Sequence, residues 1–265
     1  MPAKLSVEAI SHRYSTVDGA ELSVLEDISF DIQAGEFISV IGASGSGKTT
    51  LLRILASLMR PSAGRVLIDG EAPKGPSAKM AVVFQRDSLW PWRTVLDNTL
   101  YGLEIKGVKR RQAVERAQRY LEMVGLKGFA AYYPHQLSGG MRQRVNLARA
   151  LTVEPDILLM DEPFSALDSQ TREVMQVELT RIWQETAKTI VFITHQIDEA
   201  VFLSDRVITF SARPGSVRAV TPIALDRPRN LRIKRTEQFQ TYVGQLWDLI
   251  EHEVMKGFQA ETVEP

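Results

Sequence analysis

The sequence predicts an α/β fold in which helices cover a mostly parallel sheet. Two observations lead to this prediction. Apolar runs of strand length, such as 37–41 and 157–160, alternate with amphipathic helical stretches such as 172–187. The run at 37–41 also leads through a glycine-rich loop into a helical stretch. That order is typical of sheets that bind a ligand beyond the carboxyl ends of their strands.

The composition is that of a globular protein, with 44% hydrophobic and 24% charged residues among 265. The 32 basic residues balance the 32 acidic ones, so net charge does not favour nucleic acid as a partner. The chain has no cysteine, which excludes disulfides, thiolate metal sites and cysteine nucleophiles. No apolar run has the length of a membrane span, and 1–10 lacks a signal-peptide core. We therefore expect any role at a membrane to depend on docking to another subunit.

Before residue 86 the chain is expected to form mainly strands, with an antiparallel region around the glycine loop. Alternating or continuous apolar patterns predict strands at 5–10, 24–32, 37–41, 65–69 and 80–84. A helix is expected at 49–58, because apolar side chains recur there at helical spacing and Pro61 and Gly64 follow.

Residues 86–152 are expected to form a helical insertion between strands. Beyond it, the patterns predict strands at 157–160, 189–194, 206–210 and 215–220, and helices at 172–187, 198–203 and 239–255. The helix at 172–187 has Val174, Val177, Leu179 and Ile182 among its apolar positions. The last helix carries an apolar face of Phe239, Val243, Leu246, Trp247, Ile250 and Val254.

The segment 42–50 carries a phosphate-binding motif. Its residues Gly42, Ala43, Ser44, Gly45, Ser46, Gly47, Lys48 and Thr49 match G-x-x-x-x-G-K-[ST], and Thr50 continues into the helix. Backbone N–H groups of such a loop attract phosphate oxygens, together with the N-terminus of the following helix. Lys48 is placed to reach the terminal phosphates, and the Thr49 hydroxyl to bind Mg²⁺.

Two carboxylates, Asp161 and Glu162, directly follow the apolar strand 157–160. Adjacent residues of an extended chain point to opposite sides, so the two can have different roles. Asp161 suits the Mg²⁺ shell, and Glu162 suits the polarisation of an attacking water. A solvated acidic strand end is the alternative interpretation.

A second glycine-containing helix start lies at 137–144, Leu-Ser-Gly-Gly-Met-Arg-Gln-Arg. Ser138 is a good N-cap residue, and Gly139 and Gly140 leave the first helical turn open to an anion. An ordinary helix cap would explain the same residues. The buried stripe of this helix is expected to contain Met141, Val145, Ala148 and Leu151.

Together these segments resemble the ATP-binding cassette family of ATPases over about 5–222. The motifs occur in the family's order: an aromatic residue (Tyr14), the phosphate loop, the Q-loop glutamine (Gln85), the signature (137–144), the acidic strand end (157–162), the D-loop (165–168) and the switch histidine (His195). Met141 is a departure, because many members carry glutamine there. The resemblance implies a P-loop NTPase core with a mostly parallel sheet, an N-terminal antiparallel β region and a helical signature subdomain. It divides residues 1–222 into a core of 1–85 and 153–222 and a helical subdomain of about 86–152, followed by a helical extension at 223–265.

The resemblance also implies roles for individual residues. ATP with Mg²⁺ would be bound by the phosphate loop, with Thr49, Gln85 and Asp161 around the ion. Glu162 would be the catalytic base, Gln85 would contact the ion or the attacking water, and His195 would orient Glu162 and that water. Two copies would pack head to tail, so that Ser138, Gly139, Gly140 and Met141 reach the partner's nucleotide and Asp168 organises the dimer seam. Tyr14 would stack on adenine, although an ordinary strand-end aromatic is the alternative.

Leu89, Trp90 and Trp92 lie just after the Q-loop glutamine. In transporters of this family the region lines a groove for a helix of the membrane subunit, where clustered aromatics would serve as anchors. Alternatively, both tryptophans pack within the helical subdomain. The segments 89–92, 137–141 and 211–215 (Ser-Ala-Arg-Pro-Gly) together resemble the importer branch that takes up nitrate, sulfonates such as taurine and related small anions or heterocycles.

The resemblance thus implies an importer ATPase at the cytoplasmic face of the plasma membrane. It would dock as a homodimer on two permease subunits that receive solute from a binding protein. The alternatives are an exporter ATPase, a cassette protein acting on ribosomes or nucleic acid, and an NTPase without a transport role. The balanced charge argues against nucleic acid, and the signature and His195 argue against the last class. The extension is expected to pack on the cassette, although it could instead contact a partner.

Overall fold

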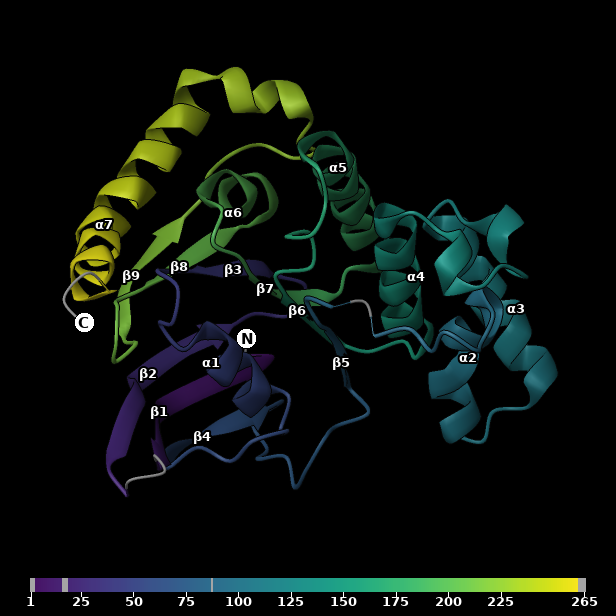
Figure 1. Ribbon diagram of the computed structural model, residues 1–265, viewed down its shortest axis with the longest axis horizontal. Helices are drawn as coiled ribbons and strands as arrows, with labels where there is room; N and C mark the ends of the chain where they lie inside the picture. Colours follow the sequence, from purple (N-terminus) through teal and green to yellow (C-terminus); the bar gives the residue numbers. More distant parts are fainter. Residues whose placement is uncertain (1–2, 16–18, 87, 262–265) are drawn as a thin grey trace. The chain divides into compact units, whose positions relative to one another are not determined.

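The computed structural model describes residues 3–15, 19–86 and 88–261, with side chains up to residue 251 (Figure 1). Contacts divide the chain into two compact units. The first unit comprises Met1–Ser77 and Thr189–Pro265, and the second comprises Ala78–Lys188. The predicted mixed α/β class, with parallel and antiparallel strands, is confirmed.

The first unit contains an antiparallel sheet with the strand order β2-β1-β4. Its strands are β1 (Leu5–Ser15), β2 (Glu21–Ile32) and β4 (Ala63–Ile68). Leu5 pairs with Ile32 on one side and with Ile68 on the other. The phosphate loop follows a strand of the parallel sheet and not a strand of this one.

The parallel strands of the first unit lie in the order β7-β3-β8, with β9 on the outside. They are β3 (Phe37–Ile41), β7 (Thr189–Ile193), β8 (Arg206–Phe210) and β9 (Val217–Pro222). Every residue of β3 and β7 is buried, as expected for strands that are covered on both faces. β9 returns antiparallel to β8, so the predicted hairpin is confirmed.

Helix α1 (Lys48–Leu55) follows the phosphate loop. It ends earlier than the expected range 49–58, because Ser57 adopts a left-handed backbone with φ of 57°. Short helix α6 (Ile197–Leu203) and long helix α7 (Glu237–Glu261) complete the unit, with a 3₁₀ turn at Leu231–Arg235.

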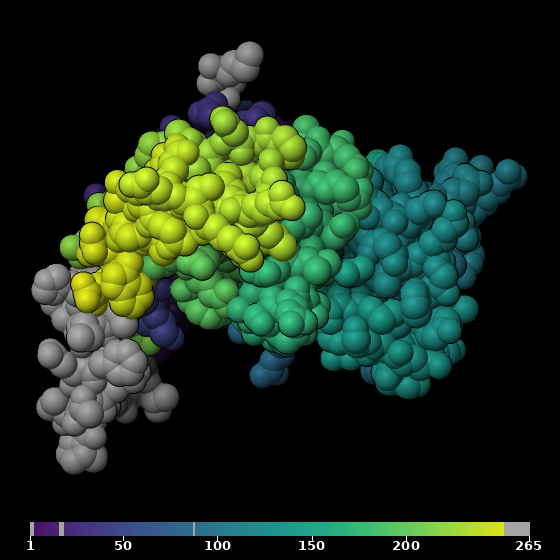
Figure 2. Space-filling view, turned by 90° about the horizontal axis from the view of Figure 1, so that it is seen from above, coloured from purple at the N-terminus to yellow at the C-terminus, as the bar shows by residue number. Residues whose placement is uncertain are grey.

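Helix α7 packs against α6, β8 and β9 and forms part of the surface of the first unit (Figure 2). Phe239, Leu246 and Ile250 are buried, whereas Trp247 is 47% exposed. The extension therefore packs on the rest of the first unit through Phe239, Leu246 and Ile250 of the predicted face. The side chain of Val254 lies outside the described residues.

The second unit contains the parallel pair β5 (Met80–Val83) and β6 (Ile157–Asp161). Helices α2 (Val95–Ile105), α3 (Arg110–Met123) and α4 (Gly139–Thr152) pack together around Leu100, Leu103, Ala113 and Ala117, with 3₁₀ turns at Lys127–Phe129 and Pro134–Gln136. Helix α5 is Ser169–Thr186. Of its apolar positions, Leu179 and Ile182 are buried together with Met175, whereas Val174 is 48% exposed. Within the described residues, no helix has both the length and the apolar character that crossing a bilayer requires.

Candidate functional site

The phosphate loop lies where β3 ends and α1 begins. Gly45 and Gly47 adopt left-handed backbones with φ of 74° and 85°, a region in which residues with a Cβ are strained. A Cβ on Gly47 would also lie 2.6 Å from Leu25 Cδ2 and 2.9 Å from the carbonyl oxygen of Val24. The path of the loop therefore requires glycine at position 47.

The ammonium group of Lys48 is held by oxygens of the loop. Its Nζ donates to the carbonyl oxygens of Gly42 and Ala43, both at 2.8 Å, and to Ser46 Oγ at 3.3 Å. The residue is only 6% exposed. Because a lysine ammonium is a compact charge with three donors, phosphate oxygens can replace these neutral acceptors. Lys48 is thus at the loop, as the motif predicts.

Tyr14 is joined to the first turn of α1. Its hydroxyl lies 3.3 Å from Thr50 Oγ1, and its ring meets His12 edge to face with centroids 4.7 Å apart. Tyr14 is half-buried, and Thr49 is exposed beside the buried Thr50. Thr49 lies at the first turn of α1, and both its role toward a metal ion and stacking of Tyr14 on adenine stay predictions.

Strand β7 brings His195 to the start of the phosphate loop. β7 is parallel to β3 with Ile193 opposite Val40, and His195 follows two residues later. One pocket of about 490 Å³ is lined by Gly42, Ala43, Ser44 and His195. The structure therefore brings together two motifs that lie about 150 residues apart in the sequence.

The same pocket has an apolar wall that the sequence did not assign to it. Val243, Trp247 and Ile250 of α7 line the pocket, together with Gln196, Ile197 and Asp198. Amphipathic spacing indicated that this helix has a buried face. It could not indicate which element the face covers, because spacing carries no information about the partner.

In the second unit, β5 and β6 place Gln85 beside Glu162. Val83 is opposite Met160 in this parallel pair, so the residues after both strands meet at one edge. Gln85 Nε2 lies 3.4 Å from Glu162 Oε2 and 3.2 Å from Ser165 Oγ. Glu162 also has a left-handed backbone with φ of 43°. Such strained residues are concentrated at functional sites.

Helix α4 begins at the signature. Ser138 caps it, with its Oγ accepting a 3.2 Å hydrogen bond from the Met141 amide. Ser138 and Gly139 are exposed, whereas a Cβ on the buried Gly140 would lie 2.7 Å from Thr171 Cγ2. Met141 is half-buried and does not belong to the fully buried stripe, because it lies in the first turn. The other three predicted residues of the stripe, Val145, Ala148 and Leu151, are buried.

A pocket of about 610 Å³ joins the Q-loop, the signature and the D-loop within the second unit. Its lining residues are Gln85, Arg86, Gly139, Arg142, Gln143, Pro163, Ser165, Ala166 and Leu167. Gln143 was not singled out in the sequence, yet its buried side chain donates to the carbonyl oxygen of Pro163. The sequence signal that could have identified Gln143 is the position of a polar glutamine on the buried face of a helix.

Asp168 is the N-cap of α5. Its Oδ1 accepts a 2.9 Å hydrogen bond from the Thr171 amide. This bond lowers the pKa of the carboxyl group, because it stabilises the charged form. The cap also explains why α5 begins at Ser169 and not at the expected residue 172. Asp168 is exposed, so a role at a dimer seam stays a prediction.

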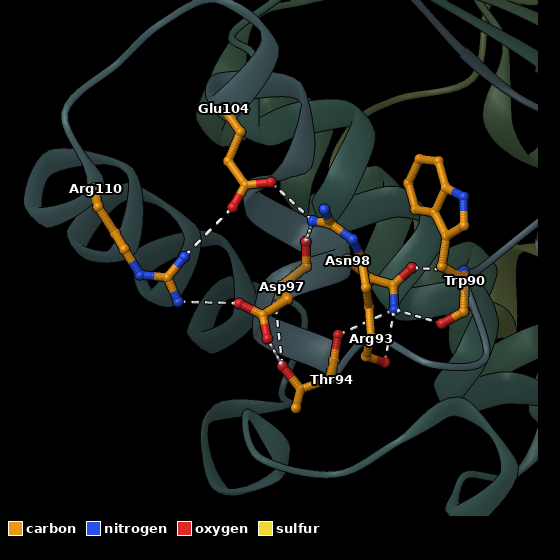
Figure 3. Close-up of polar contacts among 7 residues, drawn as sticks. All are labelled: Trp90, Arg93, Thr94, Asp97, Asn98, Glu104 and Arg110. Atoms are coloured by element: carbon orange, nitrogen blue, oxygen red, sulfur yellow. Dashed lines mark hydrogen bonds and ion pairs between the residues drawn. The ribbon is translucent and has the colours of Figure 1, made fainter.

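The segment that follows the Q-loop is fixed by Asn98 (Figure 3). The fully buried Asn98 side chain accepts from the Trp90 amide at 2.8 Å. Its Nδ2 donates to the carbonyl oxygens of Trp90 at 3.1 Å and of Arg93 and Thr94 at 3.0 Å. Thr94 caps α2 by accepting from the Asp97 amide. Both polar atoms of Asn98 therefore hold the turn at 90–94 in one conformation.

The two tryptophans of this turn have different environments. The Trp90 ring packs against Tyr101 with centroids 4.0 Å apart, and the guanidinium groups of Arg93 and Arg149 lie 5.8 and 5.6 Å from its centroid. Leu89 is buried, but Trp92 is 72% exposed. Leu89 and Trp90 thus pack within the unit, and Trp92 is presented at its surface.

Comparisons with known proteins agree with this geometry. Residues 25–165 match the family model for ABC transporters. A taurine import ATP-binding protein of Rhizobium johnstonii is 51% identical over 215 residues, covering 81% of this chain and 82% of the relative. A nitrate import ATP-binding protein of Synechocystis is 44% identical over 246 residues, covering 91% of each. The dimeric structure of a bacterial ABC transporter cassette has a TM-score of 0.74 at 33% identity, covering 84% of this chain and 100% of that one.

Proposed function

Because this chain belongs to the ABC transporter family of ATP-binding proteins, we propose that it hydrolyses ATP to energise import of a small solute through a membrane permease. The observation that carries the proposal is the pocket in which His195 lies beside the first residues of the phosphate loop. Because the Lys48 ammonium is held by neutral oxygens, phosphate oxygens can replace them as its acceptors. The histidine beside the loop can hydrogen-bond a terminal phosphate oxygen.

Hydrolysis needs a base for the attacking water, and Glu162 takes this role. Its contact with Gln85 and its strained backbone support the assignment. Gln85 orients the carboxylate and the water, and His195 contacts the phosphate. The nucleotide lies on residues 42–50, with Tyr14 stacked on its base.

Magnesium fits the oxygen donors of this chain. The Thr49 hydroxyl is exposed at the start of α1, and Asp161 is a 6% exposed carboxylate at the end of β6. With the Gln85 side-chain oxygen they would hold the ion, whose remaining ligands would be phosphate oxygens and water. When bound, the ion neutralises charge on the phosphates.

Two copies of the chain act together in this proposal. Ser138 and Gly139 are exposed at the N-terminus of α4, where an anion from a second copy can reach them. Gly140 and Met141 continue the first turn of α4 behind them, and the exposed Asp168 is assigned to the seam between the copies. The dimeric structures of related cassettes support this arrangement.

The permease partner contacts the turn at 89–94. Trp92 is a large exposed side chain on a turn that Asn98 holds rigid, which is the character of an interface anchor. The assembled protein is therefore peripheral at the cytoplasmic face of the membrane, with two permease subunits and a separate solute-binding protein. The names of the relatives support nitrate, taurine or a similar small anion as the solute.

Affinity purification of the full chain from its own cells, after gentle detergent extraction, tests the import assignment. We expect a membrane permease in the complex and a solute-binding protein that associates with it. Recovery of a permease without any solute-binding protein would favour the exporter alternative. Recovery of ribosomes or nucleic acid in place of a permease would contradict a transport role.

A further inference from the structure

The segment 211–215, Ser-Ala-Arg-Pro-Gly, forms the turn between β8 and β9. The turn is closed internally, because Ser211 Oγ accepts from the Ser216 amide at 2.9 Å. It is also tied to β2: the Gly215 amide donates to the carbonyl oxygen of Val24, and the Glu26 amide donates to that of Gly215, both at 2.9 Å. The turn is therefore fixed both by its own hydrogen bond and by its hydrogen bonds to β2.

This turn supports the phosphate loop at two adjacent positions. Gly215 lies so close to the carbonyl oxygen of Ser46 that a Cβ on residue 215 would collide with it. Next to this contact, Arg213 Nε donates a 3.0 Å hydrogen bond to the carbonyl oxygen of Gly45. The loop thus rests on a backbone contact and on one charged side chain.

The hydrogen bond from Arg213 fixes a peptide group that glycine would otherwise leave free. Gly45 and Gly47 have φ of 74° and 85°, and glycine changes such angles at little cost. In the trans peptide between Gly45 and Ser46, the C=O and the N–H point in opposite directions. Holding the oxygen therefore also fixes the Ser46 N–H on the opposite side of the peptide, where it donates a 3.3 Å hydrogen bond to the carbonyl oxygen of Ala43 and closes the loop.

We propose that Arg213 is a positioning residue of the nucleotide site, which fixes the Gly45–Ser46 peptide, and with it the path of the phosphate loop, by holding the Gly45 carbonyl oxygen. The inference rests on the proposed function, because it takes residues 42–50 as the ATP-binding loop. Arg213 positions the loop through this hydrogen bond and not through its charge. Arg213 is exposed, so salt and water screen its field at the phosphates.

A matched pair of variants separates the hydrogen bond from the charge. In Arg213→Gln, the side-chain nitrogen stands the same number of bonds from the backbone as Nε of arginine, and it can donate to Gly45 without a charge. Arg213→Met has a similar length but no donor. We expect Arg213→Met to raise the KM and the Kd for ATP about 5- to 10-fold, with kcat at saturating ATP changed less than about twofold. Arg213→Gln should stay within about twofold of the wild type in both constants.

Arg65→Met is the control, because Arg65 lies on β4 and has an exposed ion pair with Glu8. It should leave the KM unchanged, and all three variants should keep the wild-type melting temperature. An unchanged KM in Arg213→Met, or an equal increase in Arg213→Gln, would overturn the positioning role. If Lys48→Ala loses ATP while Arg213→Met does not, only this inference fails. If Lys48→Ala binds ATP as the wild type does, the proposed function itself fails.

Discussion

The side-chain oxygen of Asn98 accepts a 2.8 Å hydrogen bond from the backbone amide of Trp90, and its nitrogen donates back to the Trp90 carbonyl oxygen at 3.1 Å. One buried residue of α2 thereby closes the turn at 90–94 (Figure 3). Trp92, which is 72% exposed, lies on this turn. An exposed tryptophan on a fixed turn loses little conformational entropy when a partner binds it.

Replacing Asn98 should destabilise the protein strongly. Asn98→Ala leaves a buried amide and three carbonyl oxygens without this partner, so we expect a loss of about 2–4 kcal/mol in the free energy of unfolding. Asn98→Asp keeps one acceptor but places a second oxygen against the carbonyl groups, and it should be at least as unstable. Urea denaturation of the full chain measures both. A loss below about 0.5 kcal/mol in either variant would contradict the assigned contacts.

Replacing Trp92 should weaken the permease complex and leave the fold intact. Because the side chain is 72% exposed, Trp92→Ala should keep the wild-type melting temperature. An anchor residue that is lost at an interface lowers affinity by about tenfold or more. Ile105→Ala is the control, because Ile105 is a 69% exposed residue of the same unit. Equal affinities of the two variants for purified permease would argue against Trp92 as the anchor.

Arg229 should be important for stability. It is 4% exposed and donates to the carbonyl oxygens of Val201, Phe202, Ser204, Ile223 and Leu225. Arg229→Met leaves these oxygens, at the end of α6 and just after β9, without their donor, and we expect a loss of about 3 kcal/mol in the free energy of unfolding. The control Arg235→Met, at an exposed position nearby, should change little.

The effect of Arg229 should not depend on pH in the neutral range. Burial lowers its pKa to about 10. The guanidinium is therefore charged in both the folded and the unfolded state below that value, and only above it does the folded state release the proton first. Denaturation curves at about pH 6 and pH 9 should give the same difference between Arg229→Met and the wild type. A difference that changes across this range would contradict a charged Arg229.

Lys48→Ala should lose nucleotide affinity, because it removes the positive charge of the loop. Titration with a fluorescent ATP analogue should give a Kd raised at least about tenfold. Lys109→Ala, at an exposed position of the other unit, should bind as the wild type does. Unchanged binding by Lys48→Ala would exclude the assigned role of this lysine.

The sequence was informative where a pattern is local. Strand β3, the glycine loop and the start of α1 lie within 20 residues and have one combined signature. The apolar run of β7 likewise predicted a buried strand, and the parallel pairing of β7 with β3 explains why His195, which the family resemblance pointed to, lies beside the loop.

The relationships that sequence did not predict are contacts between distant segments. Arg213 and Gly45 are 168 positions apart, and no periodicity connects them. The two tryptophans at 90 and 92 cannot be told apart from the sequence. Trp90 packs within the unit because its ring contacts Tyr101 and Arg149, which lie further along the chain. The wall that α7 gives to the His195 pocket depends in the same way on tertiary packing.

The central claim is that two copies of this chain complete each other's ATP site, and the Glu162→Gln variant tests it most directly. Without its base, the variant should hydrolyse ATP at a rate that is lower by about 10²-fold or more. In size-exclusion chromatography with light scattering, it should form a dimer with Mg²⁺ and ATP but stay monomeric with ADP. Adding Ser138→Arg should abolish that dimer, because it fills the exposed start of α4. A Glu162→Gln chain that binds ATP and remains monomeric would contradict the claim.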